Sequence, residues 1–295
     1  MKNDYKIVIT GASGWLGKEL IYFLYERFGN KIYNILYPIS HSFDNLTFDF
    51  GKIKCYKFND IKNEKNIILY HLAFITKDKT TKMTKDEYIK HNINLRDEIA
   101  TLISKNHILS MFYPSSGAVY KRGTSNIIDN CDDDIYGYLK IQDESFFQNL
   151  CKINNIKLLI TRIFSVFGKH INKSGVYALQ DMTYQAKMTG QIKINARNET
   201  YRNYINIQDL WNIVNHFILD ANSENYYIFD SFGQTFEMQQ LAELIFKTLK
   251  LKPNIVRDFD AKLNPDNYFG NPEKQYILLA KYNIILSNIE SALVI

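Results

Sequence analysis

The sequence has few cysteines and no long apolar run. Its three cysteines, Cys55, Cys131 and Cys151, are widely spaced and odd in number, which argues against a disulfide framework and favours reduced, structural thiols. No apolar stretch approaches the roughly 18 residues of a membrane helix, so we expect a soluble chain. With 46% apolar and 23% charged residues the composition is that of a globular protein and excludes disorder.

Clusters of metal ligands and segments of one charge are also missing. The histidines, at positions 41, 71, 91, 107, 170 and 216, show no metal-ligand spacing, and we expect no metal site. The net charge is +5, and the lysines are dispersed, which is compatible with an anionic small ligand and does not require nucleic acid. The first residues lead into the first expected strand without an apolar signal region, which favours a cytoplasmic protein.

The segment from Thr10 to Gly17, Thr-Gly-Ala-Ser-Gly-Trp-Leu-Gly, follows the apolar run 7–9 and precedes a helical pattern that stops at Gly29. Its glycines let the backbone approach a ligand, and the free N–H groups of the following helix face that ligand. Such a turn suits a pyrophosphate. A plain tight turn between a strand and a helix remains the alternative, because this motif alone is weak.

The order of elements predicts an α/β fold, a Rossmann-type doubly wound parallel sheet with a smaller, discontinuous C-terminal domain. We expect a cofactor domain in 1–168, to which 204–230 partly returns, and a substrate domain in 169–203 and 231–295. Further strands are expected at 32–39, 53–58, 66–72, 109–113, 157–162, 191–194, 204–207 and 226–229, and helices at 85–104, 136–154, 177–189, 209–219 and from 236 to 249.

The end of the second expected strand decides which dinucleotide would bind. An acidic residue there would hydrogen-bond the adenosine ribose of NAD, but the chain offers Ser40 and His41, which are uncharged donors suited to a 2′-phosphate. This favours NADP over NAD, although no Arg or Lys stands there to strengthen the argument. Asp60 and Ile61 follow the third expected strand where an adenine would lie, and Asp60 is read equally well as a turn residue.

Tyr136 and Lys140 are four residues apart, so on a helix they share one face. A neighbouring ammonium favours the phenolate and brings a tyrosine toward the working range of an acid or base. Ser116 follows a strand, and the carboxyl ends of parallel strands face the ligand crevice. By itself the Tyr-x-x-x-Lys pair is expected by chance in a chain with 21 tyrosines.

Together these motifs resemble the extended short-chain dehydrogenase/reductase family of nucleotide-sugar enzymes. The resemblance rests on the glycine spacing, Leu72-Ala73, Ser116, the Tyr136/Lys140 pair and Arg202-Asn-Tyr-Ile-Asn-Ile-Gln-Asp209, and it covers nearly the whole chain. It implies the catalytic residues Ser116, Tyr136 and Lys140 and a nucleoside-diphosphate sugar as substrate. From the strand ends and the resemblance together, the expected cofactor contacts are Gly11, Ser13, Gly14, Trp15, Leu16, Gly17, Ser40, His41, Asp60, Ile61, Leu72, Ala73 and Asn92. The expected substrate contacts are Thr76, Ser116, Arg202 and, more weakly, Arg257.

Departures from the family pattern narrow the reaction. Dehydratases of the family carry Asp-Glu directly after the serine or threonine, whereas this chain has Gly117-Ala118, which argues against dehydration. We therefore expect a reductase that uses NADPH to reduce a 4-keto-6-deoxy sugar. A 4-epimerase with bound NAD is the alternative, and a non-catalytic sensor of NAD(P) is a remote one.

The resemblance also implies a homodimer that pairs the helix bearing Asn92 with the helix bearing Tyr136. Apolar residues on the second of these helices could form the dimer surface, although packing against the sheet would explain many of them equally well. These residues are Ile135, Leu139, Phe146, Phe147 and Leu150.

Overall fold

The computed structural model describes residues 5–77, 83–169 and 178–293. The first four residues, His170 and the start of the helix expected at 177 lie outside them. The chain forms two compact units. The first unit comprises 1–115, 128–161 and 214–228, and the second unit comprises 116–127, 162–213 and 229–295.

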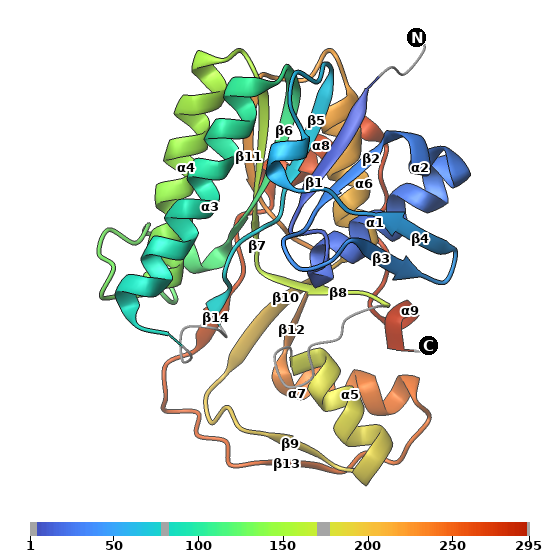
Figure 1. The fold of residues 1–295 in the computed structure, drawn as a ribbon. Helices are drawn as coiled ribbons and strands as arrows, with labels where there is room; N and C mark the ends of the chain where they lie inside the picture. The colour runs from blue at the N-terminus through green and yellow to red at the C-terminus, as the bar shows by residue number, and fades with distance from the viewer. Residues whose placement is uncertain (1–4, 78–82, 170–177, 294–295) are drawn as a thin grey trace. The chain divides into compact units, whose positions relative to one another are not determined.

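A six-stranded sheet in the order β11-β7-β6-β5-β1-β2 confirms the expected α/β class (Figure 1). β1 pairs in parallel with β2 on one side and with β5 on the other, and β5 pairs in parallel with β6. The order of the strands in the sheet therefore reverses at β1, with β2 on one side of it and β5 on the other, and the carboxyl ends of β1 and β5 lie side by side. The strands are β1 (Lys6–Thr10), β2 (Leu36–Ile39), β5 (Ile67–His71), β6 (Ile108–Ser116), β7 (Lys157–Ile163) and β11 (Tyr226–Asp230).

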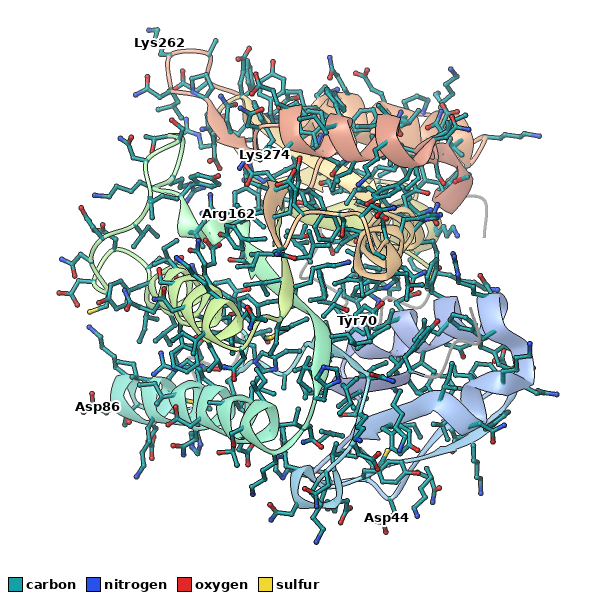
Figure 2. All side chains as sticks on the ribbon, turned by 90° about the horizontal axis from the view of Figure 1, so that it is seen from above. Asp44, Tyr70, Asp86, Arg162, Lys262 and Lys274 are labelled. Atoms are coloured by element: carbon teal, nitrogen blue, oxygen red, sulfur yellow. The ribbon has the colours of Figure 1, made fainter. Side chains whose placement is uncertain are left out.

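Helices α1 (Trp15–Phe28), α3 (Lys85–Lys105) and α4 (Ile135–Ile153) belong to the first unit. Gly29, at φ 53°, ends α1 as expected. Figure 1 shows α3 and α4 side by side along one face of the sheet. Apolar residues of both helices, among them Ile103 and Phe147, form one buried cluster with the strands. Figure 2 shows Tyr70 of β5 in the interior and Asp86 of α3 at the surface.

Two expected strands were wrong in extent or position. Residues 32–35, expected to be strand, form the short helix α2 (Ile32–Ile35), and only Leu36–Ile39 is strand. In place of the strand at 53–58, β3 (Asn45–Phe48) and β4 (Gly51–Lys54) form an antiparallel hairpin, followed by a 3-10 turn at Phe58–Asp60. The return of the chain to the main sheet as β11 is confirmed.

The second unit contains a four-stranded group in which β10 pairs with β12, β14 and β8, and a separate parallel pair, β9 with β13. Its core lies between α5, α7 and α9 and includes Phe167 and Tyr204. Helix α6 (Ile207–Leu219) runs from one unit into the other. The remaining elements are β8 (Ser165–Phe167), α5 (Ala178–Thr189), β9 (Ile192–Ile194), β10 (Thr200–Asn206), β12 (Gln234–Glu237), α7 (Met238–Thr248), β13 (Ile255–Arg257), β14 (Asp266–Tyr268), α8 (Glu273–Tyr282) and α9 (Glu290–Leu293).

None of the helices in the described ranges is both long and apolar enough to span a membrane. Among the same residues no three His, Cys, Asp or Glu side chains are grouped so that they could hold a metal ion.

Candidate active site

The glycine turn lies where β1 and β5 end together. Gly11 has φ +68°, and a Cβ there would come within 2.7 Å of the Ala73 nitrogen, so the turn and the segment after β5 touch backbone to backbone. A Cβ at Gly17 would lie 2.5 Å from the Gly11 carbonyl oxygen. Only glycine allows both the left-handed turn and this close packing of α1 against it.

The first turn of α1 suits an anion. The N-cap residue is Gly14, which has no side chain to cap the helix, and the first turn of α1 contains no acidic residue. The N–H groups at this end therefore keep their positive electrostatic field for a ligand. Ser13 and Gly14 are exposed, Leu16 is half-buried, and Trp15 is buried with its indole nitrogen donating to Glu19 at 3.3 Å. The arrangement fits the pyrophosphate of a dinucleotide.

The segment from Leu72 to Thr76 continues from β5 and is half-buried. The Thr10 hydroxyl accepts a hydrogen bond from the Ala73 nitrogen at 3.2 Å. Asn92 of α3 accepts one from the Ile75 nitrogen at 2.8 Å. Asn92 is buried, so in this structure it fixes the course of the segment beside the glycine turn.

Tyr136 and Lys140 lie on α4, as expected. Asp134 caps this helix by accepting hydrogen bonds from the nitrogens of Tyr136 and Gly137. The ring of Tyr136 meets Phe74 edge to face, with centroids 5.6 Å apart. The ammonium of Lys140 lies 3.9 Å from the Phe74 ring centroid and 6.0 Å from that of Tyr136. The segment after β5 thus connects the glycine turn to the tyrosine and lysine.

Lys140 is almost completely buried. It donates hydrogen bonds to the Pro114 carbonyl oxygen at 2.8 Å and to the Tyr113 hydroxyl at 3.2 Å. Burial lowers the pKa of Lys140 to about 7, and the carboxylates of Asp143 and Glu144 oppose that change. Burial also lowers the pKa of His71, so its imidazole is neutral. One of its ring nitrogens shares a 2.8 Å hydrogen bond with the Thr10 hydroxyl.

Ser116, at the end of β6, belongs to the second unit, whereas Tyr136 belongs to the first. Its hydroxyl accepts a hydrogen bond from the Ala118 nitrogen at 3.1 Å, and the residue is buried. The preceding residue, Ser115, donates to Glu144 at 2.5 Å. A Cβ at Gly117 would lie 2.4 Å from the Phe164 ring, so no larger side chain fits this position as packed.

The end of β2 has a cation that sequence reasoning missed. Lys57 donates hydrogen bonds to the carbonyl oxygens of Ser40 and His41, both at 3.0 Å. The Ser40 hydroxyl accepts hydrogen bonds from the backbone nitrogens of Ser42 and Phe43. The His41 ring lies 3.6 Å from a carboxylate oxygen of Glu98. The Asp60 carboxylate accepts from the Lys57 nitrogen at 2.8 Å and so caps the following turn. The Ile61 side chain is buried in the core of the first unit.

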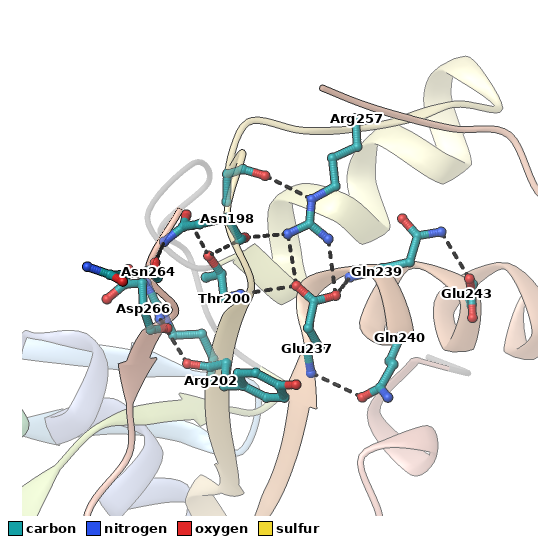
Figure 3. A network of polar contacts seen from close by, with 12 residues as sticks. Asn198, Thr200, Arg202, Glu237, Gln239, Gln240, Glu243, Arg257, Asn264 and Asp266 are labelled. Atoms are coloured by element: carbon teal, nitrogen blue, oxygen red, sulfur yellow. Dashed lines mark hydrogen bonds and ion pairs between the residues drawn. The ribbon is translucent and has the colours of Figure 1, made fainter. Parts of the chain in front are cut away.

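The two arginines proposed for the substrate have different surroundings in the second unit (Figure 3). Arg202 donates to Asp266 at 2.8 Å, and the same carboxylate accepts from Arg122 at 2.5 Å. These two arginines hold the pKa of Asp266 down to about 2. One carboxylate thus faces two guanidinium groups, which leaves a net positive charge for an anion.

Arg257 is committed to structural contacts. Its guanidinium bonds to the Glu237 carboxylate at 2.9 and 3.1 Å and to the carbonyl oxygens of Ala196 and Asn198 (Figure 3). Its side chain is 7% exposed. We therefore leave Arg257 out of the proposed substrate contacts.

The first unit brings together the glycine turn, the segment 72–76, Asn92, Tyr136 and Lys140. Sequence reasoning missed Phe74, which contacts both Tyr136 and Lys140, and the buried pair Tyr113 and Asp143. An aspartate three residues after Lys140 was the available signal, because i and i+3 share a helix face.

A doubly wound sheet with a glycine turn at its switch point defines a dinucleotide-binding protein of the Rossmann type. The chain belongs to the NAD dependent epimerase/dehydratase family, whose model matches residues 7–228. None of the curated proteins compared with the chain matches it.

Solved structures of the same fold cover nearly the whole chain at low identity. UDP-N-acetylglucosamine 4-epimerase from Methanobrevibacter ruminantium M1, in complex with UDP-N-acetylmuramic acid, has a TM-score of 0.72 at 15% identity. RMD from Pseudomonas aeruginosa, complexed with NADPH, has 0.72 at 14%, and MoeE5, in complex with UDP-glucuronic acid and NAD, has 0.73 at 13%. Each alignment covers 98% of this chain and 96% of the other.

Proposed function

We propose that the protein is an NADPH-dependent reductase that converts the 4-keto group of a nucleoside-diphosphate sugar to a hydroxyl. The observation that carries the proposal is the buried Lys140 beside Tyr136, joined to the glycine turn through Phe74 and Ala73. A cation next to a tyrosine at the edge of a dinucleotide cradle serves proton transfer coupled to hydride transfer. A 6-deoxy sugar is the substrate class that we favour.

In the proposed reaction the glycine turn would hold NADPH, which would supply the hydride for the keto carbon. Tyr136 donates the proton to the resulting oxygen, and Ser116 donates a hydrogen bond to the same oxygen. Lys140 would stabilise the phenolate of Tyr136 by its charge and would bind the ribose hydroxyls of the cofactor. Arg202, whose carboxylate partner is shared with Arg122, binds the diphosphate of the substrate.

Two further observations support reduction over dehydration and NADP over NAD. The Phe164 ring fills the space beside Gly117, so the extra acid of a dehydratase has no room there. Lys57 puts a positive charge at the end of β2, where a 2′-phosphate would lie. The end of β2 has no acidic residue of its own to bind the ribose of NAD.

A 4-epimerase with tightly bound NAD is the second candidate, because the same tyrosine and lysine serve it and 4-epimerases of UDP-sugars share the fold. Protein that purifies with NAD and converts a sugar without added cofactor would favour it.

We further propose a cytoplasmic homodimer formed through α3 and α4. Leu139 and Phe147, expected at that surface, are instead buried, Phe147 in the core of the first unit.

The test of the proposed function is turnover. We expect purified protein to oxidise NADPH with at least one of a panel of 4-keto nucleotide sugars. Tyr136→Phe should lower kcat by roughly 100-fold or more, because it removes the general acid, and should leave the Kd for NADPH unchanged. No oxidation with any sugar would contradict the reductase, and equal activity in the variant would remove Tyr136 from the mechanism.

A further inference from the structure

A buried chain of polar groups extends from Lys140 away from Tyr136. Lys140 donates to the Tyr113 hydroxyl at 3.2 Å, and that hydroxyl donates to Asp143 Oδ2 at 2.9 Å. The one proton of the tyrosine is committed to the carboxylate, so its oxygen can only accept from Lys140. The two hydrogen bonds therefore run in one direction, from Lys140, which donates, through the Tyr113 hydroxyl to the Asp143 carboxylate, which accepts.

We infer that Asp143 is a positioning residue of the proposed reaction, acting through the Tyr113 hydroxyl to hold Lys140 in place as an ammonium beside Tyr136. The inference rests on the proposed function, because that function gives Lys140 its role. Tyr113, Lys140 and Asp143 are all buried, and they come from β6 and from one face of α4.

The charges around Lys140 show why it needs a counterion. The titratable groups that face it are Tyr136, Asp143 and Glu144 of α4, Tyr113 of β6 and the neutral His71 of β5. Burial favours the neutral amine, which would not stabilise the Tyr136 phenolate, and the nearby carboxylates oppose this effect.

The carboxylate of Asp143 is joined to Lys140 by a hydrogen-bonded path through the Tyr113 hydroxyl. Glu144 accepts from Ser115 at 2.5 Å. Arg96 of α3 lies 3.8 Å from Asp143 on its far side. A cation on each side favours the ionised form of Asp143, although burial raises its pKa.

The ultraviolet absorbance of tyrosinate tests the inference without any substrate. The difference between the pH titrations of the wild type and Tyr136→Phe isolates Tyr136 from the other tyrosines. For the Asp143→Asn variant, the same difference is taken against the double variant Asp143→Asn/Tyr136→Phe. We expect the midpoint of the Tyr136 titration to move to higher pH by about one unit or more, because Lys140 loses its counterion. Tyr113→Phe, which breaks the link but keeps both carboxylates, should move it in the same direction.

The matched control is Asp97→Asn, the same chemical change at an exposed carboxylate 4.0 Å from Arg96, and it should leave the midpoint unchanged. An unmoved midpoint in folded Asp143→Asn would overturn the inference. If that variant does not fold, an unmoved midpoint in Tyr113→Phe does so. Absence of turnover with every sugar, together with a moved midpoint, would refute the proposed function and leave only the coupling of Asp143 to Tyr136 through Lys140 standing.

Discussion

Lys57 shows how the fold supplies a charge that the local sequence lacks. It lies in the segment after β4, yet its ammonium bonds to the carbonyls of Ser40 and His41 at the end of β2. The two carbonyls fix the ammonium at the end of β2, where the proposed cofactor would carry its 2′-phosphate. At the scale of one residue, we propose that this contact favours NADP over NAD.

We predict that Lys57→Ala raises the Kd for NADPH about tenfold or more and leaves the Kd for NADH unchanged, because a charge-assisted hydrogen bond to the 2′-phosphate is lost. Fluorescence titration measures both constants. Lys54→Ala is the matched control, since its ammonium lies over the Tyr56 ring at 5.1 Å and should leave both unchanged. An equal loss of affinity for both dinucleotides would mean that Lys57 acts only by holding the turn.

At the scale of elements, Asp266 connects β14 to β10 through Arg202 and also binds Arg122. Its pKa is depressed in the folded protein, so its carboxylate stabilises the fold fully above the unfolded value of about 4. That contribution declines as the pH falls toward about 2, where the folded form is protonated as well.

We therefore predict that Asp266→Asn lowers the free energy of unfolding at pH 7 and that its difference from the wild type shrinks as the pH falls from 4 toward 2. Urea unfolding followed by circular dichroism at several pH values measures this. Asp258→Asn should have little effect at any pH, because the ion pair of Asp258 with Arg197 is largely exposed. A difference that stays constant with pH would contradict the role given to the carboxylate.

The elements predicted best from the sequence are those whose signals are local. Helix α3 begins after Thr84, whose side chain exchanges hydrogen bonds with Glu87, and α1 ends at Gly29. Three of the four residues 32–35 are β-branched or aromatic and therefore indicate a strand. They nevertheless form the short helix α2 after a 3-10 turn at Gly29–Lys31, with Ile32 buried.

The candidate site also combines residues that local spacing pairs with contacts that only the folded chain brings together. Tyr136 and Lys140 share a helix face through their spacing alone, so the sequence was sufficient to pair them. Asp143 shares that face too, but its importance depends on Tyr113, which is 30 residues away and reaches it only after β6 packs against α4. The Lys57 contact depends in the same way on the β3–β4 hairpin, which local patterns did not indicate.

At the scale of the whole molecule, ligand binding and folding are linked. A cofactor that binds only the folded first unit must stabilise it, by about 2.7 kcal/mol at a hundredfold excess over Kd. We expect NADPH to raise the melting temperature measured by scanning fluorimetry, and NADH to raise it less at equal concentration. A larger rise with NADH would reverse the proposed cofactor preference.

Light scattering tests the proposed assembly. We expect twice the mass of one 34.6 kDa chain. Because Leu139 and Phe147 are buried, the dimer would have to form through other residues of α3 and α4. The mass of one chain at micromolar concentration would refute the homodimer.

The contact between Gly117 and Phe164 restricts the order in which this active site could change by mutation. An acidic residue at position 117 clashes with the ring 2.4 Å from its Cβ, so that substitution alone is deleterious. A smaller residue at position 164 would have to come first, and it would leave a cavity without adding any activity. Conversion to a dehydratase, which also needs an acidic residue in place of Ala118, therefore requires at least three substitutions, and those at positions 117 and 164 depend on each other.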